Sequence, residues 1–170
     1  MSIKIGTVHT GKVVRKSEFG VFVGINGARN TGLVHFSRLR GNSSDLRHQR
    51  LADIEIGEEM IVEVVSIEKT DSLTRMALSE KIVHDSLIVH HLPVDEAIRG
   101  VVTSKIDCGV IVLLPGWFVS GLLHVSRMAG ANSSEQLETM RSFAVGGELE
   151  VAVKKITLDD DNLKLKLAQL

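Results

Sequence analysis

Short runs of alternating apolar and polar residues dominate the chain, and turn-forming residues separate them. In the first half these runs are rich in Val and Ile and occupy residues 7–15, 20–25, 31–35, 60–66 and 74–79. Because successive side chains of a strand point to opposite faces, the period of two predicts five short β-strands. Asn26-Gly27 predicts a tight turn between the second and third strands. Residues 43–45 predict the start of a short helix at 46–51.

The same pattern occurs a second time at a constant offset of 89 residues. Residues 11–41 align on residues 100–130 without a gap, and thirteen of the thirty-one positions are identical. This identity indicates a duplication, and two copies are too few for a solenoid, so each copy should close its own core. The second copy predicts strands at 98–104, 109–114, 120–124, 149–154 and 163–167, with a helix near 134–140.

Five short strands with a helix between the third and fourth predict a small closed barrel, which removes unpaired sheet edges. The predicted fold class is therefore all-β, with two tandem five-stranded barrels. The predicted domains are 1–81 and 98–170, joined by a restrained linker at 82–97. This linker is not rich in Gly or Ser, and we expect its residues 87–89 to pack on one or both barrels.

Composition excludes several classes of protein. In 170 residues no apolar run approaches the roughly 20 residues that span a bilayer, and the first ten residues lack the apolar core of a secretory signal. We therefore expect a cytoplasmic or organelle-interior protein with no membrane partner. Cys108 is the single cysteine, which leaves no intrachain disulfide and no thiolate zinc cluster. No metal site, cofactor or catalytic constellation is predicted.

The two halves differ in charge although the formal net charge is −1. Residues 1–81 contain twelve Lys or Arg and ten Asp or Glu, whereas residues 82–170 contain eight and eleven. A difference in sign suggests different partners. The loop 38–50 of the first half is the more basic one, and beside an aromatic face its Arg38, Arg40 and Arg47 would form a phosphate-contacting rim. The alternative is a charged loop that is simply solvated.

Five motifs follow one another in the first copy: G-K-V at 11–13, E-F-G-V-F-V at 18–23, G-L-V-H-F-S at 32–37, G-E-E-M-I-V-E-V at 57–64 and D-S-L-T-R-M-A-L-S at 71–79. In this order they resemble the S1 RNA-binding domain, an OB-fold module named after the bacterial small-subunit ribosomal protein in which it repeats. The resemblance extends over both copies and nearly the whole chain. It implies that each barrel is an OB-fold.

The resemblance also implies a nucleic-acid face with two aromatics on the second strand, a His on the third, and an Asp and a basic residue around the fifth. The first copy fills every position, with Phe19, Phe22, His35, Asp71 and Arg75. At the same positions the second copy has Cys108, Ile111, His124, Asp160 and Lys164. Because both stacking aromatics are missing there, we expect the second copy to have a degenerate RNA face.

An exposed Phe stacks on the flat face of any base, which is worth about 1–3 kcal/mol per base and selects no sequence. Phe19 and Phe22 are three residues apart, which strict alternation places on opposite faces. A bulge at Gly20 would turn both outward, and the alternative is that either Phe belongs to the core. Lys12 on the first strand adds a contact for the phosphate backbone.

Trp117 and Phe118 distinguish the second copy, because Ala28 and Arg29 stand at their positions in the first. Together with Ile111 they enlarge an apolar surface, which favours docking on a protein. Replacement of the stacking pair and filling of the barrel mouth are the alternatives.

The sequence therefore predicts a non-catalytic protein whose first domain binds single-stranded RNA and whose second domain docks or orients, in translation or RNA processing. Single-stranded DNA would fit the same stacking and phosphate contacts. The alternative function is a protein-interaction adaptor, or a subunit that docks on a ribosome or RNA-processing complex and contacts RNA incidentally.

Overall fold

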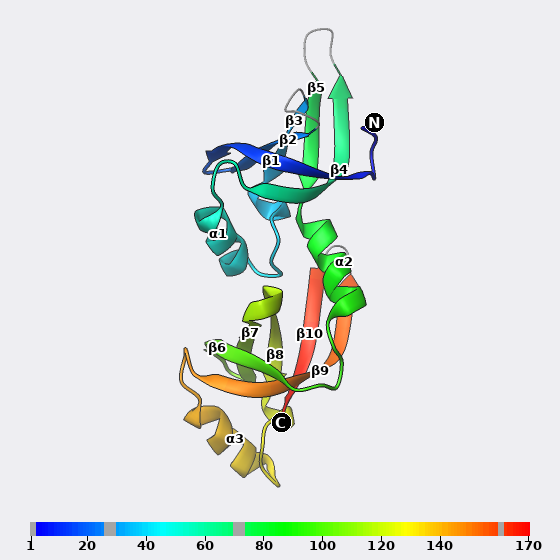
Figure 1. The fold of residues 1–170 in the computed structure, drawn as a ribbon. Helices are drawn as coiled ribbons and strands as arrows, with labels where there is room; N and C mark the ends of the chain where they lie inside the picture. The colour runs from blue at the N-terminus through cyan, green and yellow to red at the C-terminus, as the bar shows by residue number, and fades with distance from the viewer. Residues whose placement is uncertain (1–2, 26–29, 70–73, 160–161) are drawn as a thin grey trace. The chain divides into compact units, whose positions relative to one another are not determined.

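The computed structural model describes the chain except for residues 1–2, 26–29, 70–73 and 160–161. It divides into two compact units, Met1–Leu87 and Ile88–Leu170. Each unit contains a closed five-stranded β-barrel, as Figure 1 shows. In the part of the chain that is described, no helix is both long and apolar enough to cross a membrane.

The first barrel consists of β1 (Val8–Ser17), β2 (Gly20–Ile25), β3 (Asn30–His35), β4 (Glu59–Lys69) and β5 (Thr74–Ser79). These strands close in the order β1-β2-β3-β5-β4. The β3–β5 pair is parallel and the other pairs are antiparallel. Helix α1 (Ser44–Asp53) follows β3 and begins after Ser43, whose hydroxyl accepts a hydrogen bond from the backbone N–H of Leu46.

The second barrel repeats this arrangement with β6 (Ile98–Ile106), β7 (Gly109–Leu114), β8 (Val119–His124), β9 (Glu148–Asp159) and β10 (Asn162–Gln169). Its strands close in the corresponding order, β6-β7-β8-β10-β9, again with one parallel pair. Helix α3 (Ser133–Ser142) lies between β8 and β9 in the chain. The duplication seen in the sequence is therefore a duplication of a whole barrel with its helix.

Each barrel has its own apolar core, formed by the inward residues of the alternating strands. Val21, Val23 and Val34 are fully buried in the first core, and Val110, Val112 and Leu123 are their counterparts in the second. Several strands run past their predicted ends, and β4 and β9 do so furthest, to Lys69 and Asp159. The register shifts on β4 between Val64 and Ser66, and on β9 between Val153 and Lys155. These bulges interrupt the period of two, which is why the pattern alone ended both strands too early.

The segment expected to be a linker, 82–97, begins inside helix α2 (Lys81–His91), and the division between the two units falls within this helix. Ile88 and Leu92 are buried in the core cluster of the second barrel. Leu87 and Val89, which we expected to pack with Ile88, are exposed instead. The connection is therefore a helix that anchors one apolar side chain per turn in the second core.

Candidate nucleic-acid interface

A continuous row of outward-facing residues crosses the first barrel from β1 to β4. The strand register pairs Phe22 with Arg15 on β1 and with Leu33 on β3. Leu33 pairs with Ala77 on β5, and Ala77 pairs with Ser66 on β4. Four residues of this row line an open groove of about 680 Å³, whose full lining is Phe22, Thr31, Leu33, Ser66, Glu68, Thr74, Arg75, Met76 and Ala77.

Phe22 is the aromatic residue at the centre of this face. Its neighbours Val21 and Val23 are 0% exposed and point into the core, whereas Phe22 is half-buried and points outward. The guanidinium of Arg15 lies over the Phe22 ring, 4.1 Å from its centroid. A cation held over a π-face in this way is attracted by the ring quadrupole, so the outward ring of Phe22 already has a cation over it.

Phe19 lies in the turn between β1 and β2, where its side chain is 64% exposed. The resemblance implies both aromatics on the second strand, whereas Phe19 precedes β2, as the strand predicted at 20–25 already has it. The bulge expected at Gly20 is not at that position. The bulge lies on β1, between Val13 and Arg15. Gly20 opens β2 at φ +150°, and a Cβ there would come 2.1 Å from the backbone oxygen of Val34. This close approach admits only glycine and turns the chain so that Phe19 stands clear of the strand.

His35 ends β3 opposite Gly20 and is exposed. Its Nδ1 accepts a hydrogen bond from the backbone N–H of Ser37 at 3.2 Å and lies 2.9 Å from the Ser37 hydroxyl. His124 makes the same two contacts with Ser126, at 3.1 and 2.8 Å. The Nδ1 contact is therefore structural in both barrels. Because Nδ1 accepts, the proton of the neutral ring lies on Nε2, which is the nitrogen that can donate to a ligand.

The other residues predicted for this face are placed as follows. Arg75 is exposed on β5, pairs with Glu68 in the register and lines the groove. Lys12 is exposed on β1 and pairs with Gly24, two residues beyond Phe22 on β2. Asp71 lies outside the described residues. The structure thus brings Phe22 and Arg75 to one groove, with Phe19, His35 and Lys12 on the strands and turn beside it.

The basic loop that follows β3 makes structural contacts that the sequence did not predict. Arg47 donates from Nη1 to the backbone oxygen of Gly41 at 3.1 Å, and its guanidinium lies 6.0 Å from the Phe36 ring. The backbone N–H of Arg40 donates to Glu80 Oε1 at 3.0 Å. Arg38, Arg40 and Arg47 are all half-buried. Their predicted role as a phosphate rim stays a prediction, because much of each side chain faces the protein.

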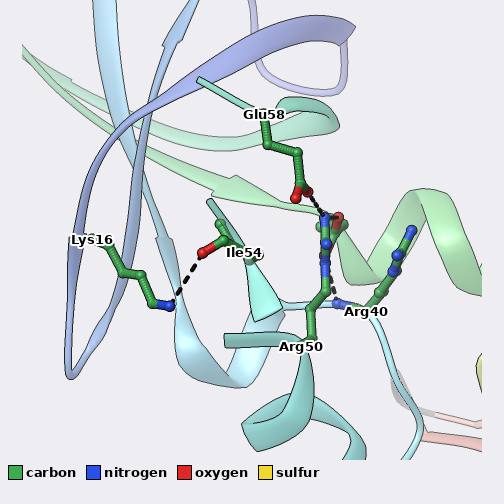
Figure 2. Close-up of polar contacts among 6 residues, drawn as sticks. Lys16, Arg40, Arg50, Ile54 and Glu58 are labelled. Atoms are coloured by element: carbon green, nitrogen blue, oxygen red, sulfur yellow. Dashed lines mark hydrogen bonds and ion pairs between the residues drawn. The ribbon is translucent and has the colours of Figure 1, made fainter. Parts of the chain in front are cut away.

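A buried ion pair next to this loop is the main polar feature that sequence reasoning missed. Arg50 donates from Nε and Nη2 to the two carboxylate oxygens of Glu80, at 3.1 and 2.7 Å, and both residues are nearly fully buried. Glu58 lies 2.8 Å from Arg50 Nη2, and Figure 2 shows Arg50 reaching from α1 toward it. Lys16 donates to the backbone oxygens of Ala52 and Ile54 at the end of the same helix, both at 3.1 Å.

This environment shifts the protonation of Arg50. Burial alone lowers the pKa of the guanidinium, but the hydrogen bond and charge of Glu80, aided by Glu58, outweigh burial and raise the pKa above its ordinary value. The arginine is therefore charged at any ordinary pH, and the pair is a permanent link between α1 and the start of α2.

The repeat itself contained a signal for this pair. At the offset of 89, Arg50 and Glu80 correspond to Thr139 and Gln169, so both partners are charged in one copy and neutral in the other. In the second barrel Gln169 Oε1 accepts a hydrogen bond from the backbone N–H of Ala129 at 2.8 Å. This contact is equivalent to the one between Glu80 and the backbone N–H of Arg40 in the first barrel. Thr139 donates to the backbone oxygen of Ala129 at 2.7 Å. Positions 50 and 80 therefore differ together from positions 139 and 169, because in each barrel the two side chains lie at the same place, which we call the junction.

In the second barrel the equivalent face lacks aromatic rings. Cys108 is exposed in the turn before β7, and Ile111 is half-buried at the position of Phe22. Trp117 ends a 3₁₀ turn (Pro115–Trp117) and packs partly against the second core. Phe118 is half-buried and adopts the left-handed conformation, with φ 52° and ψ 46°. Among the described residues, no three His, Cys, Asp or Glu side chains gather in a way that could hold a metal ion.

Comparisons with known proteins agree with the motifs of the first barrel. Residues 2–79 match the model of the S1 RNA binding domain. The chain is 31% identical to the small ribosomal subunit protein bS1 of Neisseria meningitidis over 97% of its own length and 28% of that protein. It is 27% identical to a 4-hydroxy-3-methylbut-2-enyl diphosphate reductase of Clostridium acetobutylicum, over 97% of its own length and 24% of that enzyme. The chain therefore spans about a quarter of the length of each.

Among solved structures, GSP13 from Bacillus subtilis is 22% identical with a TM-score of 0.40, and the match covers 56% of this chain and 64% of that one.

Proposed function

We propose that the first barrel, whose residues 2–79 match the S1 RNA binding domain, binds single-stranded RNA without enzymatic activity. The proposal includes an OB-fold for both barrels, which the closed order β1-β2-β3-β5-β4 supports. The observation that supports RNA binding best is the outward ring of Phe22 in the groove, with exposed Phe19 and His35 beside it.

The roles of the individual side chains follow from their chemistry. Phe22 and Phe19 stack on bases, and because every base has a flat π-face, this contact selects no particular RNA sequence. Arg15 already lies on the Phe22 ring, and its guanidinium plane extends the stack to the next base. His35 donates from Nε2, and Arg75 and Lys12 contact phosphates. Asp71, which lies outside the described residues, stays a predicted member of this face. The arginines of the basic loop, Arg38, Arg40 and Arg47, add phosphate contacts through those parts of their side chains that reach solvent.

The test is a fluorescence-anisotropy titration of labelled single-stranded RNA at two salt concentrations. We compare the wild type with Phe19→Ala/Phe22→Ala and with the matched control Cys108→Ala/Ile111→Ala on the second barrel. Loss of two stacked bases should cost about 2–6 kcal/mol, or at least roughly 30-fold in affinity. Equal binding by wild type and the Phe variant, with circular dichroism showing both folded, would refute base stacking by this face.

We propose that the second barrel docks on a larger partner, or orients the RNA-bound first barrel on it. We propose a ribosomal small subunit as the large partner, because the Neisseria relative is named as one of its proteins. Trp117, Phe118 and Ile111 are the candidate contacts. Phe118 supports this choice, because a bulky residue in the left-handed region is strained and such strain clusters at functional sites.

Docking is tested by co-sedimentation of the chain with ribosomal small subunits. Phe118→Gly is the preferred variant, because glycine adopts the left-handed conformation freely, whereas loss of Trp117 would also disturb the core. If Phe118→Gly sediments as well as the wild type, this surface is not the docking site. If sedimentation instead requires Phe19 and Phe22, the contact with the subunit is through its RNA.

A further inference from the structure

The outer face of the second barrel displays a set of lysines that the stacking model does not use. On β10 the leucines 163, 165 and 167 are buried in the core, and Lys164 and Lys166 between them are exposed. On β9, Lys155 is exposed and pairs directly with Lys166 in the register. Lys155, Lys164 and Lys166 therefore stand on one face of two adjacent strands, and we call them the lysine face.

This arrangement opposes two like charges within one cross-strand pair. Like charges directly opposite each other destabilise a sheet. Among the described residues, no acidic side chain forms an ion pair with any of the three lysines, whereas nearby Lys154 lies 2.8 Å from Asp95. Exposed lysines that have no ion-pair partner among the described residues present their charge to solvent, where an anion can bind.

The lysine face lies where the groove lies in the first barrel. At the offset of 89, Lys155 and Lys166 occupy the positions of Ser66 and Ala77, and Lys164 that of Arg75. The row continues from Lys166 through Leu122 to Ile111. In this row the second copy has thus lost the ring of Phe22 and the cation of Arg15, which correspond to Ile111 and Ser104, and has gained two cations, although its half of the chain is the acidic one.

We propose that the lysine face binds the phosphodiester backbone of the same single strand whose bases stack on the first barrel. The inference rests on the proposed function, since it requires that the chain binds RNA. Lys164 and Lys166 are two residues apart on one strand, or about 6.6 Å, a regular spacing that suits the repeated charges of an extended backbone. Once the first barrel holds the strand, the second binds it intramolecularly, which raises its effective concentration.

The test measures how strongly salt weakens RNA binding. We compare Lys155→Gln/Lys166→Gln with Lys4→Gln/Arg99→Gln, a control that removes two positive charges from exposed residues outside the lysine face. Each phosphate contact contributes about 0.7 to the slope of log affinity against log salt for a single strand. The slope of the lysine variant should therefore be smaller by about 1.4. Between 50 and 200 mM salt, the RNA affinity of the wild type should then fall roughly sevenfold more than that of the lysine variant.

The outcomes separate this inference from the proposed function. If Phe19→Ala/Phe22→Ala weakens binding and the lysine variant keeps the wild-type slope, the inference is wrong and the stacking model stands. If the lysine variant loses slope and the Phe variant binds normally, the second barrel is the RNA-contacting one. If the variant loses binding to poly-glutamate while its RNA slope is unchanged, the face fits an acidic protein and the inference fails. Absence of RNA binding by the wild type would overturn both.

Discussion

The two barrels share a scaffold and differ in the residues displayed on its outer face. Both end the third strand with a His whose Nδ1 accepts from the backbone two residues later, and both begin the second strand with a glycine that no side chain could replace. Above this common scaffold, the central row contains Phe22 and Ala77 in one barrel and Ile111 and Lys166 in the other. Positions that build the strand end are therefore the same in both barrels, whereas the outward positions of the central row differ.

The largest expected effect concerns the junction that is ionic in one barrel and neutral in the other. Arg50→Thr installs the residue of the second barrel but leaves Glu80 buried without its cation, which should destabilise the first barrel by about 3–5 kcal/mol. Arg50→Thr/Glu80→Gln should recover most of this loss. Because the folded pKa of Arg50 is raised, its contribution is complete below its unfolded pKa and should not change across neutral pH.

The single Trp117 makes this measurement specific to one barrel. Urea unfolding followed by far-UV circular dichroism reports both barrels, and Trp117 fluorescence reports the second. We expect the variant to shift the first transition and leave the fluorescence midpoint unchanged. A shift of the fluorescence midpoint by the same amount would mean that the barrels unfold as one unit. The stabilities of the two barrels could then not be compared separately.

The next effect tests whether one missing ring is what distinguishes the faces. Ile111→Phe restores the aromatic at the centre of the second row, in a position that is already half-buried and outward. In the Phe19→Ala/Phe22→Ala background it should raise RNA affinity by about 1–3 kcal/mol, the value of one stacked base. Anisotropy titration measures the gain, with Ile111→Leu as the matched control. No gain would show that the second face differs in geometry as well as in residues.

The strands could be predicted from sequence because their period of two is local. The bounds of β2, β5 and β7 agree with the prediction to the residue. The course of the turn that contains Phe19 could not be predicted, since it depends on the contact of Gly20 with the backbone of Val34, which lies on the neighbouring strand. Local pattern likewise gives no sign of the bulge on β1, where an unpaired residue lies between Val13 and Arg15.

The basic loop shows the same limit for the candidate site. Composition suggests a solvent-facing rim, but Arg50 turns inward because Glu80, thirty residues away in the sequence, lies against the same helix. Only the joint change to Thr139 and Gln169 in the other copy indicates that pair in advance. The outward placement of Phe22, His35 and Arg75 could be predicted, because each is on a strand whose alternation fixes which face it occupies.

A smaller effect distinguishes the structural role of the His that recurs in both barrels from its role in RNA binding. His35→Ala and His124→Ala each remove one hydrogen bond to a backbone N–H, so each should lower the stability of its own barrel by about 0.5–1.5 kcal/mol. Only His35→Ala should also weaken RNA binding. Thermal unfolding and anisotropy on both variants test this, and equal losses of affinity would place His124 on a working RNA face as well.

The smallest expected effect concerns the cation over the Phe22 ring. Arg15→Lys keeps the charge and removes the planar group that lies 4.1 Å from the ring centroid. If that plane extends the stack, affinity should fall by about 0.5–1 kcal/mol, with the salt slope unchanged because the number of cations is the same. Ser104 pairs with Ile111 at the corresponding position of the second barrel, so Ser104→Ala is the matched control and should change nothing. An increase in affinity would mean that Arg15 competes with the base for the Phe22 ring, so that in the unliganded protein the guanidinium blocks the stacking surface.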